Sequence, residues 1–315
     1  MPKISGISRT SLWTAWKDIR RETRQSAVRD VIDFLEYDID PDRWINQLLH
    51  EIEDGSYEPA PPFRFELAKS KGFSRRMTAP TIRDIVLYRA LTAHCYRRAK
   101  RAEEPYVFFE QARLDAAARV AAGEAREEMQ REQSSYGYSG RRRWQAWLSY
   151  DEYRRRLIMQ RTYPFLVVTD ITNFFDSVLY GRIADALSGR VDARATGLLF
   201  FLLERLSIRE AFTESPRVGL PVDEFDGSRR LAHLVLFPHD HRMAKEFGRE
   251  AYVRWMDDQL IGVASRAAGF RALASIGHSL SRLHLTPNGG KSRVLSLAQA
   301  RDHFHLNTNA AREGD

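Results

Sequence analysis

The segment 251–263, AYVRWMDDQLIGV, is the stretch that decides the fold. Two apolar runs, 251–255 and 260–263, flank a polar turn that contains the adjacent carboxylates Asp257 and Asp258. Short apolar runs separated by such a turn predict two antiparallel strands joined as a hairpin. The sequence therefore places two acidic side chains at the tip of a hairpin whose flanks are apolar.

A third carboxylate ends another apolar run. Residues 165–169, FLVVT, predict a buried strand, and Asp170 follows it directly. Carboxylates gathered at the edge of a buried sheet repel one another and lose hydration, and divalent cations remove both penalties. Oxygen ligands without His or Cys favour Mg²⁺ or Mn²⁺. Two such ions, about 3.5–4 Å apart, can activate a 3′-hydroxyl and stabilise a leaving pyrophosphate. We expect Asp170, Asp257 and Asp258 to be catalytic and to hold two ions.

The second half of the chain predicts a mixture of strands and helices. After the strand at 165–169, the patterns indicate helices near 173–177, at 198–206 and beyond 226, then the hairpin, a helix at 270–283 and a strand at 294–297. This order predicts an α+β fold in which helices cover one face of a largely antiparallel sheet.

The first hundred residues are predicted to be mainly helical. An Asp-Pro pair at 40–41 is typical of a helix start, apolar residues follow on one stripe, and Gly55 is expected to end that helix. A strand at 63–67, a basic turn at 69–76 and a further helix from Thr81 complete this part.

Residues 110–160 carry a basic and aromatic pattern. The stretch 114–131 favours a solvated helix, and 134–140 resembles a loop. Two Arg triplets, 141–143 and 154–156, flank a pair of Trp residues. Arginine interleaved with aromatic residues suits contact with nucleic acid, whereas a charged helix face with its Trp residues in the core is the other interpretation. The nucleic-acid-binding candidates of this region are Arg141, Arg142 and Arg143.

Composition sets the broad class of protein. The net charge of +7 in 315 residues points to a polyanionic partner, of which nucleic acid is the commonest. A single cysteine, Cys95, excludes an internal disulfide and suits a reducing cytosol. No segment is long and apolar enough for a signal peptide or a membrane span. We expect a cytoplasmic protein with no membrane partner.

Five segments resemble, in the family's order, the motifs of bacterial reverse transcriptases. They are 75–86 (fingers motif), 167–177 (motif A), 219–232 (motif B), 255–258 (motif C) and 283–291 (motif D). Together they span about residues 50–300, and several ordered motifs are a stronger signal than any one of them. In motif C, Trp stands where the family usually has Tyr or Phe.

The resemblance implies a right-hand polymerase fold. Residues 1–160 would form a helical fingers-like region with a basic insertion at about 103–160, and 161–315 a palm with the catalytic carboxylates on an antiparallel sheet covered by helices. The thumb would be short or absent, because the sequence ends soon after Phe304. A homo-oligomer, a partner protein or a further segment would then have to replace it.

The resemblance also implies roles for individual residues. Asp170 and Asp257 would be the principal metal ligands, with Asp258 a further carboxylate and Ile171 contributing its carbonyl oxygen. Contacts to nucleic acid are implied for Gly219, Leu220 and Pro221, and nucleotide-binding roles for Arg75, Arg76, Phe175 and Lys291.

Each nucleotide-binding role has a plainer alternative. Phe175 would exclude the ribose 2′-hydroxyl, or pack in the core. Arg75 or its neighbour Arg76 would hold the triphosphate, and the sequence does not separate the two. Lys291 would neutralise or protonate pyrophosphate, or be a solvated surface lysine.

These features predict polymerisation of deoxynucleotides (dNTPs) on an RNA template, which could be a non-coding RNA, or without a template, giving DNA. Val222 and Asp223 replace the Gln-Gly that usually follows Gly-Leu-Pro, and the retron Tyr-Ala-Asp-Asp is not present. These features resemble the divergent bacterial reverse transcriptases of antiphage defence and abortive infection more than the enzymes of group II introns. A catalytically silent module that binds RNA or partner proteins is the alternative.

Two histidine patterns complete the candidate sites. The segment 239–241, HDH, resembles a metal cluster but follows Pro238 at an expected helix end. His303 and His305 alternate along a segment expected to be extended, which favours exposed residues on one face.

Overall fold

The computed structural model describes residues 4, 6–23, 31–68, 74–100, 106–108, 138–207, 217–222 and 227–304. These residues form two compact units. Unit 1 takes its described residues from 1–101, 135–141 and 175–235, and unit 2 from 102–134, 142–174 and 236–315. Both units draw on segments from either side of residue 160, and the predicted division into fingers and palm stays a prediction.

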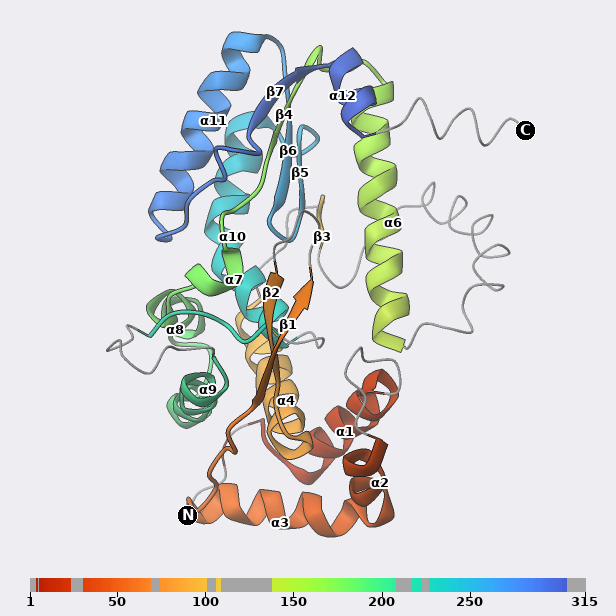
Figure 1. The fold of residues 1–315 in the computed structure, drawn as a ribbon. Helices are drawn as coiled ribbons and strands as arrows, with labels where there is room; N and C mark the ends of the chain where they lie inside the picture. Colours follow the sequence, from red (N-terminus) through yellow and green to blue (C-terminus); the bar gives the residue numbers. More distant parts are fainter. Residues whose placement is uncertain are drawn as a thin grey trace, which may run out of the picture. The chain divides into compact units, whose positions relative to one another are not determined.

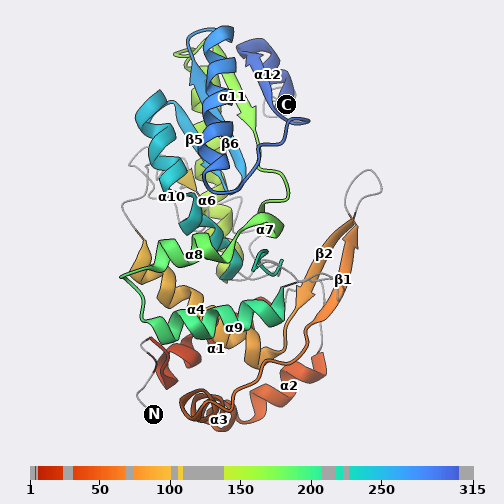
Figure 2. The same cartoon turned by 90° about the vertical axis from the view of Figure 1, so that its left-hand side faces the viewer.

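Unit 1 is helical apart from one hairpin. The helix α4 lies against α1, α8 and α9, and the strands β1 and β2 pair antiparallel beside this helical group (Figure 2). The elements of this unit are α1 (Arg9–Thr23), α2 (Val31–Ile39), α3 (Pro41–Asp54), β1 (Phe63–Ala68), β2 (Ser74–Ala79), α4 (Ile82–Ala99), α8 (Tyr180–Leu187) and α9 (Ala193–Leu206).

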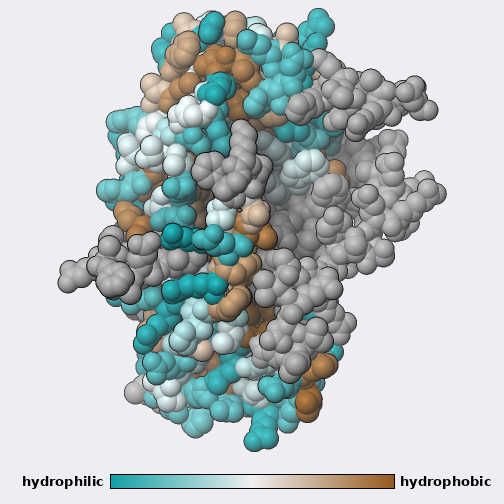
Figure 3. Space-filling view, viewed as in Figure 1, coloured by the Kyte–Doolittle hydropathy of each residue, from teal (hydrophilic) through white to brown (hydrophobic). Residues whose placement is uncertain are grey.

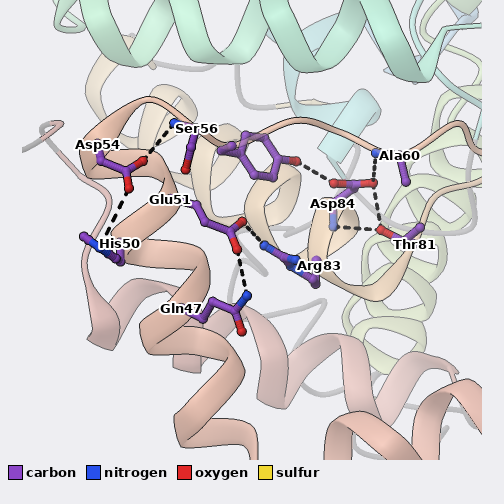
Figure 4. A network of polar contacts seen from close by, with 10 residues as sticks. Gln47, His50, Glu51, Asp54, Ser56, Ala60, Thr81, Arg83 and Asp84 are labelled. Carbon is purple, nitrogen blue, oxygen red and sulfur yellow. Dashed lines mark hydrogen bonds and ion pairs between the residues drawn. The ribbon is translucent and has the colours of Figure 1, made fainter.

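A buried carboxylate ties the start of the hairpin to α4. Asp84, at 2% exposure, accepts hydrogen bonds from the Tyr57 hydroxyl at 2.5 Å, the Thr81 hydroxyl at 2.7 Å and the Ala60 backbone N–H at 3.1 Å (Figure 4). Arg83 forms an ion pair with Glu51 of α3 in the same network. These contacts fix the proline-rich approach to β1 against α3 and α4.

Unit 2 contains a five-stranded sheet with the order β3-β5-β6-β4-β7. Its neighbours pair antiparallel except for β3 and β5, which are parallel, so the prediction of a largely antiparallel sheet is confirmed. The strands are β3 (Val107–Phe108), β4 (Phe165–Thr169), β5 (Tyr252–Trp255), β6 (Asp258–Val263) and β7 (Arg293–Ser296).

Helices cover both faces of this sheet, so the expectation of helices on one face was wrong. The C-terminal part of α10 (Gly227–Phe247) and α11 (Arg266–Ser281) lie on one face, and α6 (Tyr138–Met159) and α12 (Leu297–His303) on the other (Figure 1). The sequence of β4 explains why. Leu166 and Val167 point to opposite faces and both are fully buried, which is typical of a strand covered on two sides.

Most predicted elements are confirmed. Asp40 caps α3 by accepting from the Arg43 backbone N–H, and Gly55 ends it with φ +85°. The strands β1, β4, β5, β6 and β7 and the helices α4, α9 and α11 also lie where the sequence predicted them, with shifted ends. The short helix α7 (Phe174–Ser177) follows Asp170, as expected.

Several predictions need correction. The expected basic turn gives way to β2 from Ser74, because Arg76 pairs with Glu66 across the hairpin. Residues 138–140 belong to α6 and not to a loop. The segment with His303 is helical, because Ser296 and Gln299 form a capping box that starts α12. The predicted helix at 114–131 and His305 lie outside the described residues.

On the face drawn in Figure 3, hydrophilic residues predominate among the coloured residues, with apolar patches between them. None of the described helices is long and apolar enough to cross a membrane. The large apolar side chains with substantial exposure are Leu35, Ile39, Phe63, Leu67, Met159, Phe201 and Phe270.

The Asp84 network yields a stability prediction. Asp84→Asn keeps the shape but turns an NH₂ donor toward groups that themselves donate, so it should lower the free energy of unfolding by about 2–3 kcal/mol. Gln47→Ala is the control, because this exposed residue only bonds Glu51 one helical turn away and should cost less than about 0.5 kcal/mol. Urea unfolding measures both; equal losses would show that the buried carboxylate does not anchor the hairpin.

Candidate functional site

The pairing of β4 with β6 brings the predicted carboxylates together. The antiparallel register pairs Phe165 with Val263 and ends with Thr169 opposite Gln259. The next residues along the two strands are Asp170 and Asp258, so the same register places them as neighbours at one edge of the sheet. Two residues far apart in the sequence thus meet through backbone pairing alone.

The third carboxylate sits in the hairpin turn. Trp255 of β5 pairs with Asp258 of β6, and the two residues between them form the loop. Met256, the first of these, has φ +52°, which suits a tight two-residue hairpin turn but is costly for a residue with a side chain. Asp257 is half-buried next to it. The predicted hairpin with carboxylates at its tip is therefore confirmed.

Asp170 is buried, and only part of its hydrogen-bonding capacity is used. At 4% exposure, its Oδ2 accepts from the Lys291 ammonium at 2.5 Å, while its Oδ1 is buried with no hydrogen-bond partner among the described residues. A buried carboxylate oxygen without a donor costs free energy unless a cation or a ligand completes it. This oxygen is the clearest sign of a missing group in the described part of the chain.

The backbone around Asp170 holds the segment that carries Lys291. The Asp170 carbonyl accepts from the Asn288 N–H at 2.8 Å, and the Thr172 N–H donates to the Thr286 carbonyl at 2.9 Å. Ile171, whose carbonyl the resemblance implied as a ligand, forms an isolated bridge with Pro287 between them. These bonds bring Lys291 to the carboxylates, although its side chain is 69% exposed.

The carboxylates perturb one another. Crowding by protein atoms removes water from the Asp258 carboxylate, and this desolvation, together with the charges of Asp257 and Asp170, raises the pKa of Asp258 to about 6. The Asp258 side chain nevertheless remains accessible to solvent. Lys291 and Arg154 oppose the shift. A hydrogen bond to Asp170 raises the pKa of Lys291 and keeps it charged.

The donor chemistry suits a hard divalent cation, although no ligand set is assembled. Among the described residues, no three or more His, Cys, Asp or Glu side chains form a metal-binding group. The Lys291 ammonium, bonded to Asp170, supplies positive charge at this place instead. Asp170, Asp257 and Asp258 offer only oxygen ligands, and one oxygen of Asp170 has no partner. Because their ligands are oxygens and one buried oxygen lacks a donor among the described residues, these residues fit Mg²⁺ or Mn²⁺.

In unit 1, the segment 217–222 runs beside the start of the α7–α8 region. The Leu220 N–H donates to the Phe175 carbonyl and the Gly219 N–H to the Val178 carbonyl, both at 2.9 Å. Gly219 has φ +91°, a conformation that favours glycine. The Pro221 carbonyl accepts from the Ser228 hydroxyl at 2.5 Å. The structure thus brings the predicted residues Gly219, Leu220 and Pro221 next to Phe175, which is half-buried.

The hairpin of unit 1 joins the same segment. The Thr78 N–H of β2 donates to the Val222 carbonyl at 2.9 Å. Arg76 lies exposed on β2, and Arg75 occupies the neighbouring position of the strand, its side chain lying outside the described residues. Asp223 is also outside them. The motif-B-like segment is therefore hydrogen-bonded both to the strand that carries the predicted phosphate-binding arginines and to Phe175.

The basic triplets of α6 differ in what is described. Arg141, Arg142 and Arg143 lie on α6, with side chains outside the described residues, and their contact with nucleic acid stays a prediction. Further along, Arg154 and Arg155 both pair with Asp151, and the Arg154 guanidinium lies over the Phe304 ring at 4.5 Å. In the second triplet, Arg154 and Arg155 therefore fit the interpretation as a charged helix face.

Sequence reasoning missed two neighbours of Asp258, which are Tyr150 and Arg154 of α6. Burial is the main cause of the raised pKa of Tyr150; the charge of Asp258 raises this pKa further, and the charge of Arg154 lowers it. The Tyr150 ring lies 5.9 Å from that of Trp255, so α6 reaches the hairpin that bears the carboxylates. The spacing of four residues between Tyr150 and Arg154, which places both on one helix face, was the available signal.

The raised pKa of Asp258 predicts a pH-dependent stability. A carboxyl whose folded pKa exceeds its unfolded value disfavours folding when ionised, so this penalty is full above about pH 6 and fades as the pH falls toward 4. In metal-free buffer, Asp258→Asn should raise the melting temperature by a few degrees at pH 8 and by less at pH 4.5. Asp185→Asn, which removes an exposed carboxylate of α8, is the control. A gain for Asp258→Asn that is equal at both pH values would contradict the assigned repulsion.

Comparison with known proteins adds no identification to this geometry. No model of a known protein family matches the chain, and no curated protein matches it. The functional assignment therefore depends on the residues and their arrangement.

Proposed function

We propose that this protein is a nucleotidyltransferase of the reverse-transcriptase type, which polymerises deoxynucleotides at Asp170, Asp257 and Asp258. The observation that carries the proposal is the β4–β6 register, which makes Asp170 and Asp258 neighbours and sets Asp257 in the adjoining turn. The unpartnered Oδ1 of Asp170 supports it, because that buried oxygen is suited to a cation. RNA is the proposed template, and template-independent synthesis is the variant of the same chemistry.

The proposed chemistry assigns a part to each residue. Asp170 and Asp257 would be the main ligands of two Mg²⁺ or Mn²⁺ ions, with Asp258 and the Ile171 carbonyl as further oxygen donors. When bound, such ions activate a 3′-hydroxyl and stabilise charge on the phosphates. Lys291 keeps its proton, and its ammonium is free to turn toward a departing phosphate because most of the side chain faces solvent. The proposed setting in antiphage defence, in the cytoplasm, rests on the resemblance alone.

A specific observation favours the alternative, a catalytically silent module that binds RNA or a partner protein. Lys291 already neutralises Asp170, and the described residues form no assembled group of metal ligands. In a silent module this ion pair would be permanent. In an enzyme it has to open in favour of metal, so the two functions differ in whether Mg²⁺ or Mn²⁺ supports incorporation.

The first functional prediction concerns Asp257→Asn, which removes one negative charge from the proposed site. Purified protein should incorporate labelled dNTPs with Mg²⁺ or Mn²⁺, and Asp257→Asn should slow this by on the order of 10³-fold, because a properly placed catalytic group contributes several kcal/mol. The folded state should survive, which thermal melting checks, and Asp185→Asn should leave the rate unchanged. Incorporation by a folded Asp257→Asn at nearly the wild-type rate would remove this site from the mechanism. Sequencing products made with and without RNA separates templated from untemplated synthesis.

The second functional prediction concerns the sugar. If the Phe175 ring blocks the 2′-hydroxyl, Phe175→Ala should raise the use of ribonucleotides relative to deoxynucleotides on the order of tenfold or more, with activity retained. Phe174→Leu is the neighbouring control: Phe174 is buried at 3% exposure, so this change should cost stability and leave sugar choice as it is. An active Phe175→Ala variant with wild-type selectivity would instead assign this ring to packing.

A further inference from the structure

Two residues of the segment that resembled a metal cluster in the sequence, His239 and Asp240, make buried polar contacts inside unit 2, whereas His241 is exposed. His239 and Asp240 are about 1% exposed and lie in the middle of α10, not at its end, because Pro238 is accommodated within the helix. The expectation of a helix end was therefore wrong. Their partners are residues of the sheet and of α11, and the His239 ring bonds Gln259 and Ser279, neither of which is acidic.

His239 is a neutral connector between elements. Its Nε2 lies 2.8 Å from the Gln259 Oε1, to which it donates in the tautomer that is protonated at Nε2. Its Nδ1 then accepts from the Ser279 hydroxyl at 2.9 Å. Burial lowers the pKa of His239, in keeping with this neutral form. His239 thus links α10 to β6 and α11, and both of its ring nitrogens are engaged in hydrogen bonds within the fold.

Asp240 holds Arg254, whose side chain is completely buried in the sheet. The guanidinium of Arg254, with 0% side-chain exposure, donates to both carboxylate oxygens of Asp240, at 2.6 Å from Nε and 2.5 Å from Nη2. The Tyr252 hydroxyl donates to the same carboxylate at 2.7 Å. A bidentate pair of this kind fixes the orientation of the planar guanidinium.

The third nitrogen of this guanidinium, Nη1, reaches the turn that carries Asp257. Arg254 Nη1 donates to the Met256 carbonyl at 2.6 Å, directly before Asp257. The Met256 N–H donates to the Phe108 carbonyl of β3 at 3.3 Å. Met256, which has the unfavourable positive φ, is therefore hydrogen-bonded through both its carbonyl and its N–H. A strained backbone persists only where its surroundings hold it in place.

We infer that Arg254, oriented by Asp240, is a positioning residue that sets the Met256 turn and thereby aims Asp257 at the metal site. This inference rests on the proposed function, since it assigns a purpose to the turn that carries the proposed ligands. Arg254 touches neither substrate nor metal; it acts through the Met256 carbonyl. A buried ion pair is by itself a weak source of stability, which leaves the geometry of the turn as what this costly arrangement provides.

The test separates positioning from stability by comparing Mn²⁺ affinity with melting temperature. Mn²⁺ binding is measured from the EPR signal of the free ion. Tyr252→Phe removes a bond to Asp240 but leaves the Met256 contact, so it should lower the melting temperature slightly and change the Mn²⁺ dissociation constant less than twofold. Arg254→Lys keeps the charge beside Asp240 but lacks the fork that also reaches Met256. It should weaken Mn²⁺ binding about 10–100-fold, the usual range for groups that orient a metal ligand.

A third variant removes the ion pair altogether. Asp240→Leu combined with Tyr252→Phe and Arg254→Met replaces the charged network by apolar groups of similar volume, a change that is often neutral or stabilising. Its melting temperature should return toward the wild-type value while Mn²⁺ binding stays weak, because nothing donates to the Met256 carbonyl. If this variant does not fold, Arg254→Lys alone decides.

The possible failures are distinguishable. Wild-type Mn²⁺ affinity in folded Arg254→Lys, or in the folded triple variant, would overturn the positioning role and leave the proposed function standing, provided that Asp257→Asn abolishes binding. Wild-type protein that binds no Mn²⁺, or binds it equally after Asp257→Asn, would overturn the proposed function and this inference with it. Mn²⁺ affinity that simply follows melting temperature across all variants would also overturn the positioning role.

Discussion

The antiparallel pairing of β4 with β6 is the constraint on which the rest of unit 2 depends. Because the register continues past Thr169 and Gln259, the acidic residues that follow are forced to be neighbours. Their charges then demand compensation, and the chain supplies two cations from different elements: Lys291 from the loop before β7, and Arg154 from α6. Backbone pairing thus brings like charges together, and the charges of Lys291 and Arg154 oppose their repulsion.

The same sheet separates two kinds of polar residue by face. Along β6, Asp258 and Leu260 face the side covered by α6, whereas Gln259 faces α10 and α11 and bonds His239. The carboxylates Asp170 and Asp258 therefore lie on one side, and the buried side chains of His239, Asp240 and Arg254 on the other. The Met256 carbonyl, at the end of the hairpin, connects Arg254 to the turn that carries Asp257. Two polar clusters that look alike in the sequence thus lie on opposite faces of the sheet.

Much of this arrangement could be predicted from sequence, and the failures have physical causes. Strands such as 165–169 and the hairpin turn were predictable, since apolar runs and a short polar turn are local signals. The helix end expected at Pro238 was wrong, because Pro238 is accommodated within α10. The partners of His239 and Asp240, which are Arg254, Gln259 and Ser279, are distant in sequence, so only tertiary contacts show how these two side chains are bonded. The two-residue strand β3 escaped detection, because so short a run carries no periodicity and its pairing is parallel. The Lys291–Asp170 contact could be guessed only as proximity, not as an ion pair.

The central claim is that the three carboxylates form a cation site that Lys291 covers until metal arrives. The most direct measurement is a crystal structure of the protein soaked in Mn²⁺, with anomalous scattering used to locate the metal. We expect anomalous density between Asp170 and the Asp257–Asp258 turn, with the metal bound to the Oδ1 of Asp170 and Lys291 withdrawn from Oδ2. Saturating Mn²⁺ with no anomalous density at these carboxylates, and with the Lys291–Asp170 ion pair intact, would contradict it.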